Sequence, residues 1–160
     1  MKPCLLFFLI PAFAFAQTAA EMDMLLDTQA VGAAQAAHFV LGAAALLPPD
    51  LSGPAAQAAA FEMAKDKGWL HKNAYDAITL RDTALLVMNA FAFKGGIFFS
   101  LFPGPRYAYR EMLYRKIIQG RSDPVMIVSG PRLLQIIGRA LSFADEGGMF
   151  DTEPMQGGSL

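Results

Sequence analysis

The chain has 160 residues, of which 54% are hydrophobic and only 17% charged, with 13 Lys and Arg against 14 Asp and Glu. That length suits one domain with a tail, and the apolar fraction is too high for a disordered chain. A single cysteine excludes a disulfide framework and any zinc site built from several cysteines. The nearly neutral charge balance argues against a nucleic-acid partner.

The N-terminus has the pattern of a signal peptide. Residues 1–4 carry one lysine, Leu5 to Phe13 form the apolar stretch, and an Ala-x-Ala cleavage pattern ends at Ala16. We therefore expect a signal peptide at residues 1–16 and export to the periplasm or cell envelope. The alternative is an N-terminal membrane anchor, but the apolar run is shorter than the roughly 18–20 residues that span a bilayer. Residues 32–47 are also too short and too polar to span, so we expect no transmembrane segment in the mature chain.

The rest of the chain has the apolar periodicity of helices and the residue types that begin and end them, which makes the expected fold class all-α. Pro54 is placed to open one helix, and Thr28 is a candidate N-cap inside the first Ala-rich stretch. From Asp145 the periodicity is lost, which predicts a flexible acidic tail over residues 144–160. The predicted helices cover residues 23–47 (as one helix or two), 55–67, 79–93, 106–119 and 132–143.

Two parts of the chain share one order of features. A helix ends at a glycine, Gly68 or Gly120, and after a connector a second helix begins at Thr79 or Ser129. We expect two or three stacked helix–loop–helix units, because stacking buries apolar stripes that one helix pair leaves exposed. The alternative is that any two helical hairpins share glycine stops and Ser or Thr caps. The predicted units cover residues 20–53, 54–94 and 105–143.

The first connector carries Gly68-Trp69-Leu70 and then Ile78-Thr79-Leu80-Arg81-Asp82. This order resembles the S-layer homology (SLH) repeats of bacterial envelope proteins, in which Gly-Trp or Gly-Leu precedes an Ile-Thr-Arg-Ala-Glu motif. Arg81 stands one place later than the arginine of that family, and Asp82 replaces its glutamate. The resemblance implies a binding or scaffolding role at the cell envelope. Residues 105–111 are also similar to segments of exported spirochaete proteins, a similarity that implies no activity.

Charge is unevenly distributed along the chain. Residues 17–93 hold four basic and eight acidic groups, whereas residues 94–139 hold eight basic and two acidic ones. With tyrosines among the arginines, residues 94–121 predict a contact surface for a protein or an anionic envelope polymer. The alternative is that these arginines pair with acids of the first unit or of the tail. The candidate contact residues are Arg106, Tyr107, Tyr109, Arg110, Tyr114 and Arg115.

The sequence contains neither a G-x-S-x-G nucleophile motif nor a phosphate-binding glycine loop. We therefore expect a non-catalytic interaction or scaffolding protein with no cofactor and no metal. Two other functions are considered: a small envelope hydrolase that uses the loop around His71, and a helical carrier of an apolar ligand. In that loop we expect Trp69 to pack in the core and His71 to be solvated.

The most unusual stretch is residues 97–102, which hold five bulky apolar side chains and one serine. Two glycines precede it, and two prolines follow at positions 103 and 105. We expect these side chains to fill the core between the units, since phenylalanine at this density rarely stays in water. The alternative is an exposed apolar patch for a partner subunit or a membrane surface.

Overall fold

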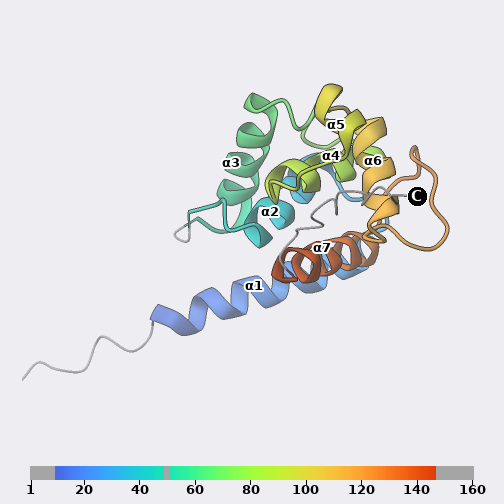
Figure 1. Cartoon of the computed structure of the whole chain (residues 1–160). Coiled ribbons are helices and arrows are strands. Elements are labelled where there is room, and N and C mark those ends of the chain that lie inside the picture. The colour runs from blue at the N-terminus through green and yellow to red at the C-terminus, as the bar shows by residue number, and fades with distance from the viewer. Residues whose placement is uncertain (1–9, 49–50, 147–160) are drawn as a thin grey trace, which may run out of the picture.

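A computed structural model describes residues 10–48 and 51–146 of the chain. Within these residues the structure is all-helical, as predicted, with seven helices and no strands (Figure 1). The helices are α1 (Ile10–Asp27), α2 (Ala33–Ala43), α3 (Gly53–Asp66), α4 (Leu80–Ala90), α5 (Ile97–Leu101), α6 (Pro105–Tyr114) and α7 (Gly130–Asp145).

The first predicted helical stretch is two helices. α1 ends at Asp27, and α2 begins after Gly32, which has an extended backbone. Thr28 is therefore not an N-cap: its hydroxyl donates back to the carbonyl of Met24 (2.8 Å) in the last turn of α1. Residues 28–32 leave the helical conformation because they pair with two distant segments, as described below.

α3 and α4 begin close to where the sequence indicates. Pro54 lies in the first turn of α3, and Gly68 follows the helix with φ +70°, a conformation that glycine adopts without cost. Thr79 is the N-cap of α4, and its hydroxyl donates to the Asp82 carboxylate (2.6 Å). α4 ends at Ala90, three residues before the predicted end.

The prediction that the fourth helix continues to Gln119 and ends at Gly120 is wrong. α6 ends at Tyr114, and Lys116 takes the left-handed conformation with φ +58°. The following Ile117 and Ile118 are buried, and both of their N–H groups bond to the carbonyl of Met112. Burial of these two side chains ends the helix five residues early, so Lys116 occupies the place that Gly68 occupies after α3.

Three backbone segments meet at the centre of the fold. Val31, Ile78 and Val128 are buried and stand immediately before the N-caps of α2, α4 and α7. Val31 donates to the carbonyl of Val128 (2.9 Å), Val128 to that of Ile78 (3.0 Å), and Ile78 to that of Val31 (2.9 Å), which closes a ring. A second set of bonds joins the same segments, from the N–H groups of Ala33, Leu80 and Gly130 to the carbonyls of Asp76, Met126 and Thr28.

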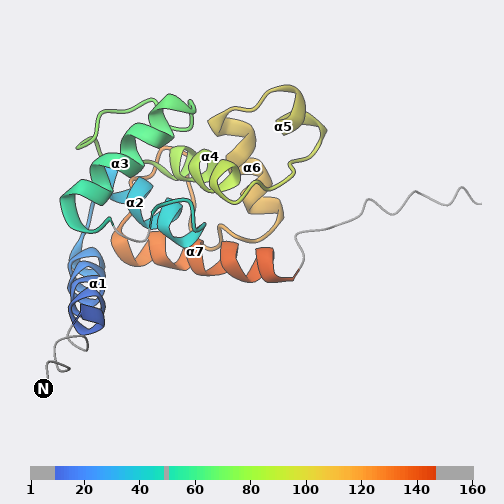
Figure 2. The ribbon, with the colours of Figure 1, turned by 90° about the vertical axis from the view of Figure 1, so that its left-hand side faces the viewer.

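The helices that follow the ring form the core. α2, α4 and α7 contact one another, and each carries a second helix: α3 packs on α2, α6 on α4, and α1 on α7. Figure 2 shows α7 alongside α2 and α4, with α5 at the end of the molecule that is remote from α1. This arrangement is compatible with the predicted helix–loop–helix units, each contributing one core helix.

α1 runs without a break across the predicted cleavage position after Ala16, and its N-terminal half extends away from the body of the molecule (Figure 1). Glu21 connects α1 to two other helices: its carboxylate is 3.2 Å from His38 Nε2 in α2 and accepts from the N–H of Gly53 in α3 (3.0 Å). These contacts lie in the part of α1 that the mature chain would keep. Residues 1–9 of the predicted signal peptide and residues 147–160 of the predicted tail lie outside the described residues. None of the described helices combines the length and the apolar character that crossing a bilayer requires.

Candidate functional site

The candidate surface is built on α6, which Gly104 and Pro105 begin after the α5 turn. One face of α6 packs on α4 through Ala108, Tyr109 and Met112, which are buried. Arg106 and Arg110 lie one helical turn apart on the opposite, solvated side and are exposed. The amphipathic register of α6 therefore presents these two guanidinium groups together.

Two of the six predicted contact residues, Tyr109 and Arg115, are directed mainly into the fold. The buried Tyr109 belongs to the face that packs on α4, as its spacing from Ala108 and Met112 indicates. Arg115 turns inward: its Nε donates to Glu111 Oε1 (2.8 Å), and its Nη2 donates to the backbone carbonyl of Lys94. Its guanidinium also lies over the ring of Phe143, 5.0 Å from the centroid. Arg115 holds α6 against the end of α4 and the last turns of α7.

Three aromatic rings stack beside the two exposed arginines. Tyr107 of α6 stacks with both Phe98 and Phe102, with both centroid distances 6.2 Å and interplanar angles of 8° and 29°. A hollow of about 170 Å³ adjoins these rings and is lined by Phe98, Tyr107, Arg110 and Tyr114 among others. Tyr114 is 84% exposed. Aromatic and arginine side chains thus share one surface at Tyr107, Arg110 and Tyr114.

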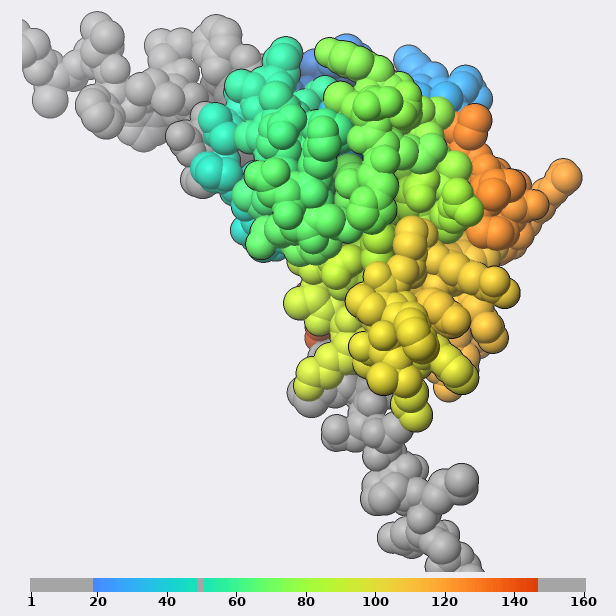
Figure 3. All heavy atoms as spheres, turned by 90° about the horizontal axis from the view of Figure 1, so that it is seen from above, coloured from blue at the N-terminus to red at the C-terminus, as the bar shows by residue number. Residues whose placement is uncertain are grey.

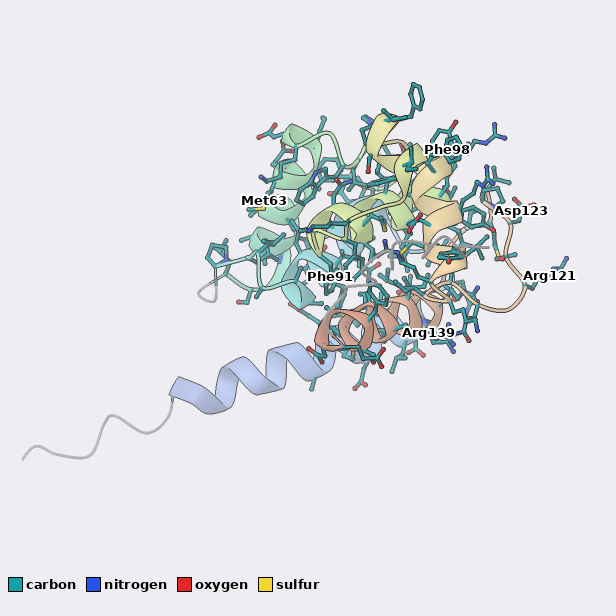
Figure 4. The ribbon with its side chains drawn as sticks, in the orientation of Figure 1. Met63, Phe91, Phe98, Arg121, Asp123 and Arg139 are labelled. Carbon is teal, nitrogen blue, oxygen red and sulfur yellow. The ribbon has the colours of Figure 1, made fainter. Side chains whose placement is uncertain are left out.

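The prediction that residues 97–102 fill the core is wrong. Ile97, Phe98, Leu101 and Phe102 are exposed, and Phe99 is the residue of this segment that packs against the core. The segment forms the short helix α5, which packs on α6. Figure 4 shows Phe98 at the end of the molecule that α5 and α6 form, and Arg121 and Asp123 on the connector that follows α6.

A second hollow contains an arginine that sequence reasoning did not assign to the site. It measures about 340 Å³ and is lined by Arg81, Arg106, Tyr109, Arg110 and Pro124. Arg81 comes from the first turn of α4, and its backbone N–H bonds to the carbonyl of Pro124 (3.0 Å), so the ring of segments brings it to α6. The sequence does contain one sign that Arg81 has a role other than stabilising its helix. A cation in the first turn lies at the positive end of the helix dipole, where it is unfavourable.

The charges around this hollow are incompletely compensated. The Asp82 carboxylate lies 3.8 Å from Arg81 Nε and 3.6 Å from Lys72 Nζ. Glu111 forms an ion pair with Arg115. Among the described residues, no carboxylate lies within ion-pair distance of Arg106 or Arg110. The predicted alternative, pairing with acids of the first unit, is therefore not observed for these two. The acidic residues at 151 and 153 lie outside the described residues.

The loop around His71, which the alternative hydrolase hypothesis uses, has Trp69 and His71 in the environments that the sequence predicts. His71 is exposed, and Trp69 is partly buried against the core. In the described part of the chain, no group of three histidine, cysteine, aspartate or glutamate side chains is placed to hold a metal ion. The other histidine, His38, contacts Glu21 and belongs to the packing of α1 on α2.

Comparison with known protein families, curated proteins and solved structures gives no match to this chain.

Proposed function

We propose that this chain is an exported, non-catalytic binding protein whose arginine hollow, formed by Arg81, Arg106 and Arg110, receives anionic groups of an envelope partner. The observation that carries the proposal is the pair Arg106 and Arg110, which are exposed, share one helix face and have no carboxylate partner among the described residues. The third guanidinium, of Arg81, lines the same hollow from another helix.

The choice of arginine supports an anion as the ligand. A guanidinium presents several N–H donors in a fixed plane that matches phosphate and carboxylate oxygens, so two or three of them together favour a group with several such oxygens. Because Arg106 and Arg110 are solvated, their attraction to an anion is screened by salt. Binding should therefore weaken as ionic strength rises.

The envelope location is supported by the sequence alone. The signal-peptide pattern at residues 1–16 predicts export, and the similarity of residues 68–82 to SLH repeats implies an envelope-associated scaffold. The all-helical fold suits such a role, since α4 packs on α6 and is hydrogen-bonded to the connector after α6, which brings all three segments around the hollow.

The proposal is tested with a charge reversal and a matched control. Arg106→Glu with Arg110→Glu should lower the affinity for isolated cell envelopes, measured by cosedimentation, at least about tenfold, or about 1.4 kcal/mol. Lys65→Glu with Lys67→Glu makes the same change in net charge on exposed side chains at the end of α3 and should bind like the parent chain. Equal binding by all three proteins, with circular dichroism unchanged, would refute the assignment of the hollow.

A further inference from the structure

The apolar side chains of α5 are arranged on one outward face. Ile97, Phe98, Leu101 and Phe102 follow the helical spacing that places residues on one side, and their exposed fractions lie between 62% and 77%. Soluble proteins expose single large apolar residues routinely, but a contiguous group of four marks a contact surface. These four residues are called the α5 tip below.

The α5 tip projects at one end of the molecule and is held against α6 (Figure 1). It stands at the edge of the molecule and packs on α6, and in Figure 3 the yellow residues around it face the viewer clear of the green residues of α3. Tyr107 stacks on both Phe98 and Phe102, which fixes the two phenylalanines relative to α6. A projecting apolar tip fits into a soft or flat apolar phase, whereas a groove would be needed to receive a helix or a strand of a partner.

Exposed cations lie on the segments that adjoin the tip. Lys94 is exposed just before it, and Arg106 and Arg110 are exposed on the helix that carries Tyr107. Glu111, the acid of α6, is neutralised by Arg115. The hollow beside the tip is lined by Phe98 and Arg110 together, so apolar and cationic groups share one surface.

This combination is that of a protein segment at a lipid–water interface. Aromatic and aliphatic side chains enter the boundary between headgroups and acyl chains, while arginine and lysine remain at the level of the phosphates. Each cation near an anionic leaflet strengthens attachment about fivefold. The positive charge of Lys94, Arg106 and Arg110 is complementary to anionic headgroups.

We propose that the α5 tip inserts into the surface of a bilayer containing anionic phospholipids, with Arg106 and Arg110 on their phosphates. This inference rests on the proposed function, since it names lipid phosphates as the anionic groups that the arginine hollow receives. It places the protein peripherally on the membrane, attached by one end, with α1 directed away from the tip (Figures 1 and 2).

The test uses the purified chain and sedimentation with vesicles of phosphatidylglycerol and phosphatidylcholine in equal parts, or of phosphatidylcholine alone. The chain should bind the mixed vesicles and lose binding at high salt. Phe98→Ser with Phe102→Ser removes apolar area from already exposed positions and should weaken binding at least about tenfold. Tyr75→Ser, at a 95% exposed aromatic position on another connector, should change nothing.

A second readout reports insertion itself. In a chain with Cys4→Ser, an environment-sensitive fluorophore on Phe98→Cys should shift to shorter wavelength when mixed vesicles are added, and the same label on Tyr75→Cys should not. If the Phe98 and Phe102 double variant binds mixed vesicles like the parent chain, or if the label at position 98 does not shift, insertion is refuted.

The outcomes separate this inference from the proposed function. If the chain binds neither kind of vesicle but still binds envelopes through Arg106 and Arg110, the bilayer is the wrong partner. The arginine hollow then remains the proposed binding site for another anionic component. If the Arg106 and Arg110 double variant binds vesicles and envelopes normally, both proposals fail.

Discussion

Helices α1 and α7 approach each other very closely at Gly130, the first residue of α7. A Cβ built on Gly130 would lie 1.6 Å from the carbonyl oxygen of Leu25 and 2.6 Å from its carbonyl carbon. Ordinary carbon–oxygen contacts are about 3.3–3.6 Å, so Gly130→Ala requires α1 and α7 to move apart by roughly 1.5–2 Å. That displacement breaks the hydrogen bond from the Gly130 N–H to the Thr28 carbonyl (2.8 Å) and disturbs the adjacent Val31–Val128 bond.

The cost can be estimated from these terms. Overpacking in a tight interior costs about 1–3 kcal/mol, and each buried backbone hydrogen bond lost adds about 1 kcal/mol. Gly130→Ala should therefore lower the free energy of unfolding by about 3–5 kcal/mol, a large part of the about 5–15 kcal/mol typical of a domain. Urea denaturation followed by circular dichroism measures the change.

The same helix provides the control. A Cβ on Gly138 would meet nothing within 4 Å, and the position is exposed in the middle of α7. Gly138→Ala should therefore stabilise the protein by about 0.5–1 kcal/mol through the helix propensity of alanine. If both substitutions shift the unfolding midpoint in the same direction, α1 does not pack on α7 in the way described.

Two further predictions concern stability. Glu21→Ala removes the contacts to His38 and Gly53 and should lower the free energy of unfolding by about 1–3 kcal/mol; an unchanged urea midpoint would show that α1 contributes no such link. Lys116→Gly relieves a left-handed conformation and should raise the melting temperature, by an amount equivalent to about 1 kcal/mol. A lower melting temperature in calorimetry would contradict the assigned end of α6.

The parts of the fold that sequence indicates correctly are those with a local signal. Pro54 opens α3 and Gly68 ends it because each residue type suits the conformation that it takes. The end of α6 has no such signal: a lysine is held in the left-handed region because Ile117 and Ile118 are buried by distant parts of the chain. The ring through Val31, Ile78 and Val128 has no local signal in the sequence either, since it joins segments about fifty to a hundred residues apart.

In the candidate site, too, some residues have a local signal in the sequence and others depend on distant contacts. Arg106 and Arg110 follow from helical spacing, and Tyr109 could have been assigned to the buried face from its register with Ala108 and Met112. Arg81 could not be placed beside them, because the backbone bond to Pro124 brings two separate segments together. The exposure of Phe98 runs against the general tendency of phenylalanine to be buried, and this departure is what motivates the membrane inference.

The central claim is that the surface of α5 and α6 meets the partner in the envelope. Photocrosslinking in intact cells tests it most directly, with benzoylphenylalanine at Tyr114, which adjoins Arg110, or at Tyr75, an exposed tyrosine on the connector between α3 and α4. The account predicts adducts with an envelope protein, polymer or lipid from position 114 and none from position 75. Adducts from position 75 alone, or from neither position, would contradict it.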